Sequence, residues 1–167
     1  VEEALAEAGD FRHEEGVRWG VCLGTTVASQ LNSLGFYRDY RQTANPHLEP
    51  VADFIRGNLA EFVAERFKLS GGPRATVVNA CSSGTDAIGV ALSWIQAGLC
   101  DAAVAGGADE LNRVPLAGFN SLGIMSRQAC RPFDRDRDGL NLGEGAGIMV
   151  LQRRDGVPAG GRQPQLA

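Results

Sequence analysis

The chain has 167 residues, enough for one domain with a sizeable core, and its 44% content of hydrophobic residues is that of an ordinary globular protein. Disordered and fibrous proteins are therefore excluded as classes, and a net charge of −4 disfavours a nucleic-acid binder. No stretch of the sequence approaches the roughly 18 consecutive apolar residues that a membrane-spanning helix needs.

The two ends of the chain have distinct compositions. The first ten residues, VEEALAEAGD, are acidic and lack the basic leader and apolar core of a signal peptide, so we expect a cytoplasmic protein. Because the first residue is Val1 and not methionine, we expect the chain to begin inside a longer protein. Residues 152–167 contain proline and glycine without periodicity, which predicts an irregular tail after a domain that spans residues 1–151.

The first half of the chain predicts one strand and two helices. Residues 17–23 form an apolar run typical of a buried strand, and residues 26–40 predict a helix with a break near Gly35. The clearest helix is predicted from residue 51 to residue 67, where apolar residues recur at helical spacing. Its inward face is predicted to consist of Val51, Phe54, Ile55, Leu59, Phe62, Val63 and Phe67.

The second half predicts short strands that alternate with helices. The Ser-Gly-Gly-Pro segment at residues 70–73 is expected to end the long helix. The elements predicted after it are strand 75–78, helix 86–97, strand 101–105 closed by Gly106 and Gly107, a helical turn or two at 115–121, loop 123–142 and strand 145–151. In helix 86–97 the predicted inward positions are Ala87, Ile88, Ala91, Leu92 and Ile95. This alternation predicts an α/β layered fold with a largely parallel sheet.

The four cysteines are far apart in the sequence, with no C-x-x-C pair and only two histidines in the chain. This pattern disfavours both a zinc site and a disulfide framework, so no metal is expected. Cys22 and Cys100 are interpreted as small buried hydrophobic residues. The pattern indicates no role for Cys130.

Cys81 lies in the stretch VVNACSSGTDAIG, where a strand pattern changes to a helix pattern. The thiol is therefore expected near the first turn of a helix, where unpaired N–H groups and the positive end of the dipole favour a thiolate. Small residues follow it and leave room for a substrate carbonyl, an arrangement that suits acyl transfer through a thioester. From position alone, a buried cysteine that only fills space is an equal alternative.

Three blocks resemble the β-ketoacyl-acyl carrier protein synthases, the condensing enzymes of fatty-acid and polyketide assembly. The segment NACSSGTDAIG resembles the nucleophile segment of that family, and VAGGADE resembles the strand and glycine pair that follow. The long block CRPFDRDRDGLNLGEGAGIMVL, residues 130–151, resembles the family's extended signature and is unlike thiolases. The resemblance implies a thiolase-like layered αβαβα fold of two similar halves, of which this chain would be most of the N-terminal half.

The resemblance also implies roles for individual residues. Cys81 corresponds to the nucleophile that accepts the acyl group, and its backbone N–H would be one donor of the oxyanion hole. Val27 and Phe119 correspond to positions that line the acyl pocket, with ordinary core as the alternative. Four residues correspond to ones that hold loops beneath the site by ion pairs and backbone hydrogen bonds, with a solvated loop as the alternative: Asp134, Arg137, Asp138 and Glu144.

The activity that the resemblance implies is decarboxylative condensation of an acyl thioester on Cys81 with malonyl-acyl carrier protein. Acyl carrier protein would be the partner, its phosphopantetheine would carry the substrates, and no other cofactor is expected. The family also implies a homodimer that is joined along the strand at residues 75–78, which contains no charge to discourage edge pairing.

Two other functions stay open at this point. One is a non-catalytic partner of the chain-length-factor type, against which Cys81 argues because such subunits lack the nucleophile. The other is a thiolase-type acyltransferase, which the block at residues 130–151 disfavours. The family's second half carries its catalytic histidines and lysine, and His13 and His47 match neither histidine motif. The isolated chain is therefore expected to be inactive.

Overall fold

The computed structural model describes residues 1–9, 12, 14–28, 30–49, 51–52 and 58–153. Its helices and strands, in chain order, are α1 (Glu2–Glu7), β1 (Trp19–Gly24), α2 (Gln30–Thr43), α4 (Leu59–Phe67), β2 (Gly71–Val77), the 3-10 turn η2 (Ala80–Ser82), α5 (Ser83–Gln96), β3 (Ala102–Asp109), α6 (Arg113–Ser121) and β4 (Gly145–Gln152). Within these residues no helix is both long and apolar enough to cross a bilayer.

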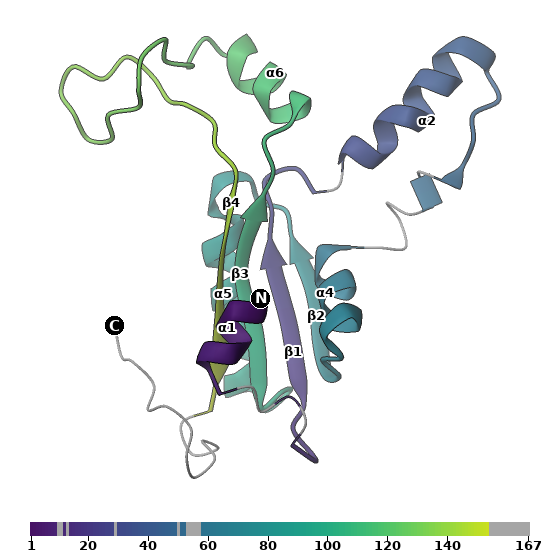
Figure 1. Cartoon of the computed structure of the whole chain (residues 1–167), viewed down its shortest axis with the longest axis vertical. Coiled ribbons are helices and arrows are strands. Elements are labelled where there is room, and N and C mark those ends of the chain that lie inside the picture. The colour runs from purple at the N-terminus through teal and green to yellow at the C-terminus, as the bar shows by residue number, and fades with distance from the viewer. Residues whose placement is uncertain (10–11, 13, 29, 50, 53–57, 154–167) are drawn as a thin grey trace.

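The strands form one four-stranded sheet in the order β2-β1-β3-β4. Strand β1 lies between β2 and β3 and runs parallel to both, whereas β4 runs antiparallel to β3. The predicted largely parallel α/β sheet is therefore confirmed. Because β1 to β3 are parallel, their carboxyl ends meet at one edge, which is the upper edge of the sheet in Figure 1.

Helices cover both faces of the sheet (Figure 1). Helices α1 and α4 pack on one face, where Leu5 and Val63 join the strand residues Val21 and Val104 in one core cluster. Helix α5 packs on the other face, where its alanines join Cys22, Cys100 and strand alanines in a second cluster. Neighbouring residues of β1 thus serve opposite faces, as alternation along a strand requires. The buried positions predicted for Cys22 and Cys100 are confirmed.

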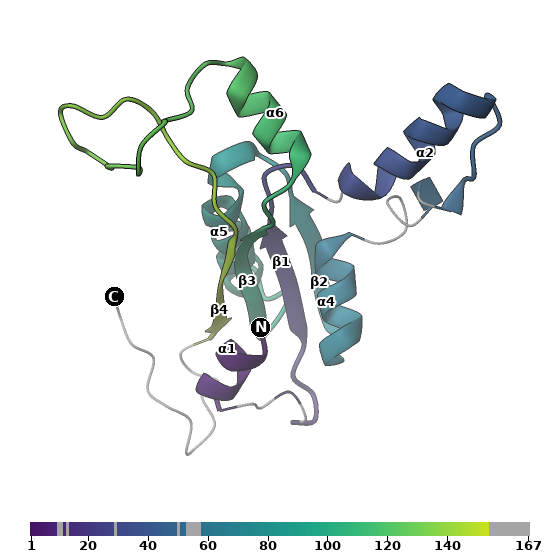
Figure 2. The same cartoon turned by 45° about the horizontal axis from the view of Figure 1, so that its top comes forward.

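The segments beyond the carboxyl edge of the sheet extend away from this body. Helix α2, helix α6 and the loop between α6 and β4 all lie beyond that edge in both views (Figures 1 and 2). The predicted loop at residues 123–142 is confirmed, with one isolated bridge between Met125 and Leu140. The helical turns predicted at residues 115–121 are confirmed as α6.

The predictions for residues 26–67 need correction. Helix α2 continues through Gly35 without the expected break. The long helix predicted from residue 51 is interrupted at Asn58, whose extended backbone caps the start of α4 with a side-chain hydrogen bond to Glu61 N–H. Phe62, predicted to face inward, is 64% exposed, and small residues of α4 are buried in its place. Phe54 and Ile55 lie outside the described residues.

Two further errors concern glycine, and a third concerns Leu92. Strand β2 begins at Gly71, so the glycines and proline expected to break the chain lie inside the strand. A Cβ on Gly72 would lie 2.6 Å from the carbonyl carbon of Trp19, which explains why glycine is required there. Strand β3 likewise continues through Gly106 and Gly107 to Asp109. In α5, Leu92 is 47% exposed instead of inward.

The C-terminal boundary differs slightly from the prediction. Strand β4 ends at Gln152, one residue beyond the predicted domain limit. Residues 154–167, which make up most of the predicted tail, lie outside the described residues. The division of the chain into residues 1–151 and a tail stays a prediction.

Candidate active site

Cys81 lies on a sharp turn between β2 and α5, and its side chain is exposed. Ala80, immediately before it, has a left-handed backbone with φ of 51°. Such a conformation costs a non-glycine residue roughly 1–2 kcal/mol and persists where the surroundings hold it. The turn places the thiol at the start of the helical segment, as the sequence predicted.

Polar side chains on both sides of Cys81 hold this turn. The side-chain amide of Asn79 donates to Ser82 Oγ at 3.0 Å and to Asp86 Oδ2 at 2.7 Å, and Ser82 Oγ also donates to Asp86 Oδ2 at 2.8 Å. These hydrogen bonds from Asn79 and Ser82 hold the pKa of Asp86 below its usual value. The carboxylate is therefore the acceptor that joins the first turn of α5 to the residue two positions before Cys81.

A second set of bonds closes the turn from inside. Ser83, whose side chain is buried, accepts a hydrogen bond from the backbone N–H of Asn79 at 2.6 Å and donates to the carbonyl of Ala80 at 2.7 Å. From the sequence, no role is predicted for Asn79 or Asp86, and Ser83 is predicted only to be a small residue that leaves room for a substrate carbonyl. The signal in the sequence that could have identified them is their position within five residues of the candidate nucleophile, Cys81.

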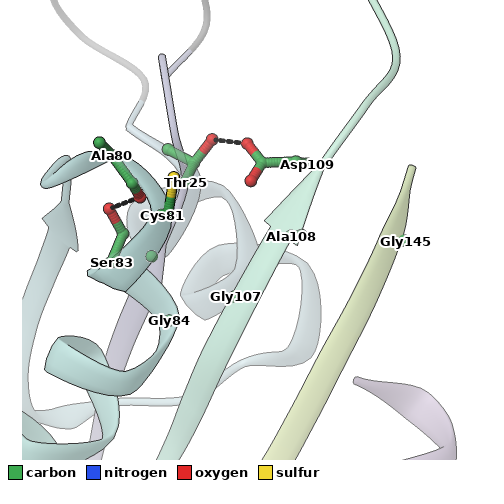
Figure 3. A pocket seen from close by; sticks show the side chains of 10 residues that line it. Thr25, Ala80, Cys81, Ser83, Gly84, Gly107, Ala108, Asp109 and Gly145 are labelled. Carbon is green, nitrogen blue, oxygen red and sulfur yellow. Dashed lines mark hydrogen bonds between the residues drawn. The ribbon is translucent and has the colours of Figure 1, made fainter. Parts of the chain in front are cut away.

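A pocket of about 190 Å³ opens beside Cys81 at the carboxyl edge of the sheet (Figure 3). Ligands of open α/β sheets bind at this edge, outside the carboxyl ends of the strands. The pocket is lined by Gly24, Thr25, Ala80, Cys81, Ser83, Gly84, Gly107, Ala108, Asp109 and Gly145. The carboxyl ends of β1 and β3, the turn that follows β2 and the start of β4 therefore meet around the thiol.

Glycines allow the start of α5 to lie directly against the strands. A Cβ on Gly24 would overlap the backbone of Ser83, closer than real Cβ atoms ever approach. A Cβ on Gly107 would lie 3.0 Å from the Cα atom of Gly84. The depth at which α5 sits, and with it the position of Cys81, thus depends on glycine at these positions.

The residues expected to line an acyl pocket lie elsewhere. Val27 follows the end of β1 and Phe119 lies on α6, and both are half-buried. In the described structure, neither is among the residues that line the pocket beside Cys81. Their role as acyl-pocket residues stays a prediction.

Each of the four expected support residues forms a hydrogen bond. Asp134 Oδ1 accepts from Asp136 N–H at 2.7 Å, and Arg137 donates to the carbonyl of Asp134 at 2.8 Å. Asp138 accepts from Ser126 Oγ at 2.6 Å, which holds the pKa of this carboxyl below its usual value. Glu144, directly before β4, accepts from Leu111 N–H at 3.2 Å.

These contacts match only part of the expected arrangement. The backbone hydrogen bonds are present, but in the part of the chain that the structure describes no ion pair joins Asp134, Arg137, Asp138 or Glu144 to one another. Their role in supporting the site stays a prediction. Among the residues that the structure describes, no group of three or more His, Cys, Asp or Glu side chains is placed to hold a metal ion.

Comparison with known proteins gives one family. The model of the N-terminal domain of β-ketoacyl synthases matches residues 1–156. The chain is 37% identical to 3-oxoacyl-[acyl-carrier-protein] synthase 2 of Rhizobium meliloti over 95% of its length and 40% of that protein. It is 34% identical to a putative polyketide β-ketoacyl synthase 1 of Streptomyces cyaneus, over 96% of this chain and 42% of that protein. The chain thus spans about two-fifths of the length of these relatives.

Solved structures agree in fold. A β-ketoacyl synthase from Burkholderia phymatum superposes with a TM-score of 0.73 at 29% identity, over 92% of this chain and 40% of that one. The ishigamide ketosynthase/chain length factor gives 0.73 at 31% identity, over 89% and 38%. A type II polyketide synthase ketosynthase, solved in complex with its acyl-carrier protein, gives 0.76 at 26% identity, over 92% and 41%.

Proposed function

The chain belongs to the β-ketoacyl synthase family and has its thiolase-like α/β fold, and we propose that the full-length protein condenses an acyl thioester on Cys81 with malonyl-acyl carrier protein. The relatives are named as a 3-oxoacyl-[acyl-carrier-protein] synthase and a putative polyketide β-ketoacyl synthase, and the reaction proposed here belongs to fatty-acid or polyketide synthesis. Either pathway is compatible with the proposal. Because the chain spans about two-fifths of these relatives, the activity of the whole protein is part of the proposal.

One observation carries the proposal. Cys81 is exposed at a strained turn that opens onto a pocket, whereas Cys22 and Cys100 are buried in the core. Burial raises the pKa of Cys22 to about 11 and also raises that of Cys100, which keeps both as neutral thiols. A nucleophilic cysteine needs access and a site for the substrate carbonyl, and Cys81 has both.

The first half-reaction is acyl transfer. Cys81 Sγ attacks the carbonyl carbon of the acyl thioester, the tetrahedral oxyanion collapses, and the carrier thiolate leaves and takes up a proton. The backbone N–H of Cys81, at the start of the helical segment, would donate to the oxyanion. The pocket beside the sulfur gives the carbonyl group a place next to the nucleophile.

The second half-reaction joins the carbon chains. Loss of carbon dioxide from the malonyl group leaves an electron pair on the α-carbon, and this carbon attacks the Cys81 thioester and releases the thiolate. We propose that groups outside this chain stabilise that carbanion. The substrates would be carried by phosphopantetheine on acyl carrier protein, and no further cofactor enters the proposal.

We propose two partners for the full-length protein: an acyl carrier protein and a second copy of the same subunit. A related ketosynthase has been solved with its acyl-carrier protein, which supports a carrier protein as the partner here. Strand β2 lies at the edge of the sheet, which supports a homodimer paired along it. Its sequence, GGPRATV, contains a single charged residue, Arg74.

A second function is favoured by one observation. A solved complex similar to this chain contains a chain length factor, so a non-catalytic partner subunit is the alternative. Cys81 argues for the catalytic subunit, because the chain-length subunits lack the nucleophile. The match to the β-ketoacyl synthase domain argues against a thiolase-type reaction.

Acylation of Cys81 tests the proposal. The full-length protein is incubated with an acyl-acyl carrier protein and analysed by peptide mass spectrometry, with Cys81→Ser as the test variant and Cys130→Ser as the control. We expect an acyl adduct on the peptide that contains Cys81 in the wild type and in Cys130→Ser. Absence of the adduct in the wild type would refute the catalytic role and favour the non-catalytic subunit.

A further inference from the structure

Asp109, the last residue of β3, anchors the segment that follows β1. Its carboxylate accepts three hydrogen bonds: from Thr25 Oγ1 at 2.9 Å, shown in Figure 3, from the backbone N–H of Thr26 at 2.8 Å and from Thr26 Oγ1 at 2.7 Å. Hydrogen bonds to an ionised acceptor are about twice as strong as those between neutral groups. One side chain thus ties the end of β1 to the end of β3 at the rim of the pocket.

Thr25 connects this anchor to the strand that leads to Cys81. Its side chain is only 7% exposed and lines the pocket, and its backbone N–H donates to the carbonyl of Val77 at 3.0 Å. Thr25 therefore connects the carboxyl end of β1 to the end of β2 through Val77, and to the end of β3 through Asp109. Three residues further on, Ala28 has a left-handed backbone with φ of 53°, a strained conformation that needs a fixed neighbourhood.

We propose that Asp109 is a positioning residue for acyl transfer: by anchoring Thr25 and Thr26 it fixes the pocket wall against which an acyl group on Cys81 lies. The inference rests on the proposed function. Asp109 forms no bond to the substrate in this scheme and acts through the two threonines. Misplacement of a positioned group by about 1 Å can cost on the order of 100-fold in rate.

Two substitutions of Asp109 in the full-length protein distinguish the loss of its hydrogen bonds from the loss of its charge. Asp109→Ala removes all three acceptor interactions. Asp109→Asn keeps three hydrogen bonds to the same groups. Its oxygen accepts from Thr25 Oγ1 and from the Thr26 N–H, and its amide donates to Thr26 Oγ1 in place of the third accepted bond. We expect kcat/KM for acyl transfer to fall about 100-fold in Asp109→Ala and less than about threefold in Asp109→Asn. Glu65→Ala, on the exposed face of α4, is the control and should leave the rate unchanged.

Two further measurements distinguish positioning from a general loss of structure. Iodoacetamide should alkylate Cys81 of Asp109→Ala within about twofold of the wild-type rate, because the Cys81 turn is held separately by Asn79, Ser82 and Asp86. Hydrogen exchange of the Thr26 amide should become about tenfold faster or more, because its charged acceptor is lost.

The outcomes are distinct. An Asp109→Ala variant that transfers the acyl group at the wild-type rate, or that exchanges its Thr26 amide at the wild-type rate, overturns the inference. A variant whose alkylation slows as much as its acyl transfer also overturns it, since the residue would then serve the fold alone. A wild type that never acylates Cys81 refutes the proposed function, whereas an active wild type with an equally active Asp109→Ala refutes only the role of Asp109.

Discussion

The four cysteines differ in burial, and burial determines how readily each should react. Cys22 and Cys100 are buried, and burial raises the pKa of both thiols, to about 11 for Cys22. Cys81 and Cys130 are exposed. Of the four, Cys81 lies at the start of a helical segment and lines a pocket.

Limiting iodoacetamide at neutral pH is therefore expected to label Cys81 first. Exposure alone separates Cys81 and Cys130 from the two buried thiols, so the informative comparison is between the two exposed cysteines. We expect Cys81 to react about tenfold faster than Cys130, measured by peptide mass spectrometry over a time course. Equal rates at Cys81 and Cys130 would mean that the turn does not activate the thiol.

Asp101 gives a pH-dependent contribution to stability at the opposite end of the sheet. Arg18 donates to its carboxylate from the side chain at 2.9 and 3.0 Å and from the backbone at 2.9 Å, and these bonds lower the pKa of Asp101 to about 2. A carboxyl whose pKa is lower in the folded state stabilises the fold above its unfolded pKa. This contribution should be complete above about pH 4 and should be lost as the pH falls toward 2.

Asp101→Asn tests this contribution. The two side chains are 44% and 35% exposed, so solvent screening reduces the expected loss at pH 7 to about 1 kcal/mol in the free energy of unfolding. The variant should also lose less stability than the wild type between pH 4 and pH 2. Urea unfolding at a series of pH values measures both effects. Asp136→Asn, whose carboxylate forms no hydrogen bond in the described structure, is the control, and an identical loss in that variant would contradict the argument.

At the scale of elements, the sequence predicts the type and order of most elements but not their limits. Apolar runs predict β1 and β4, and helical periodicity predicts α5, whose Ala87, Ala91 and Ile95 are buried. Gly72, Pro73, Gly106 and Gly107 were interpreted as chain breakers. Their role depends on neighbours that are remote in sequence, such as Trp19 beside Gly72. Pro73 is tolerated because β2 is an edge strand with one unpaired side.

The same limit applies to the site. Cys81 could be predicted, because its strand-to-helix turn is local in sequence. Asp109 and Gly24 could not, because β1 is inserted between β2 and β3, and chain order does not determine this arrangement. The helical spacing of apolar residues predicts that Phe62 and Leu92 face inward. The structure buries small alanines at the contacts instead, which lets the helices approach the sheet closely.

A pair of glycine substitutions tests this close approach. Gly24→Ala should destabilise the chain by about 3 kcal/mol, because the added Cβ would overlap the backbone of Ser83. Gly89→Ala, within α5 and with no atom near its Cβ, should stabilise it by up to about 1 kcal/mol through helix propensity. Urea unfolding followed by circular dichroism measures both, and a Gly24→Ala variant as stable as the wild type would contradict the described packing.

At the scale of the whole molecule, the free edge of β2 predicts a dimer of the full-length protein. In the described sheet β2 pairs with β1 alone, so its other edge presents unpaired backbone groups, and Val78 at its end is 52% exposed. Val78→Lys should raise the dimer dissociation constant at least about tenfold by placing a charge beside the shared edge. Leu48→Lys, at a residue that is 67% exposed on another segment, is the control. A wild-type mass of one subunit by light scattering at micromolar concentration would refute the dimer.

We expect the steps of the condensation to be divided between this chain and the rest of the full-length protein. Condensation needs a nucleophile, an oxyanion hole and groups that stabilise the carbanion formed as carbon dioxide leaves. In the proposed mechanism the described residues would supply Cys81 and one backbone donor, and the lining of the pocket beside Cys81 contains no histidine or lysine. His47 is exposed and lies 4.0 Å from Glu49, and His13 is outside the described residues.

The 167 residues alone should therefore release no carbon dioxide from malonyl-acyl carrier protein, whereas the full-length protein should release it and form the β-ketoacyl product. Loss of a single oxyanion donor costs on the order of 10²–10³ in rate, and loss of the carbanion-stabilising groups adds to this. The assay follows carbon dioxide and product with purified chain and both thioesters. Turnover by the isolated chain that disappears in Cys81→Ala would show that these residues hold every group the reaction requires.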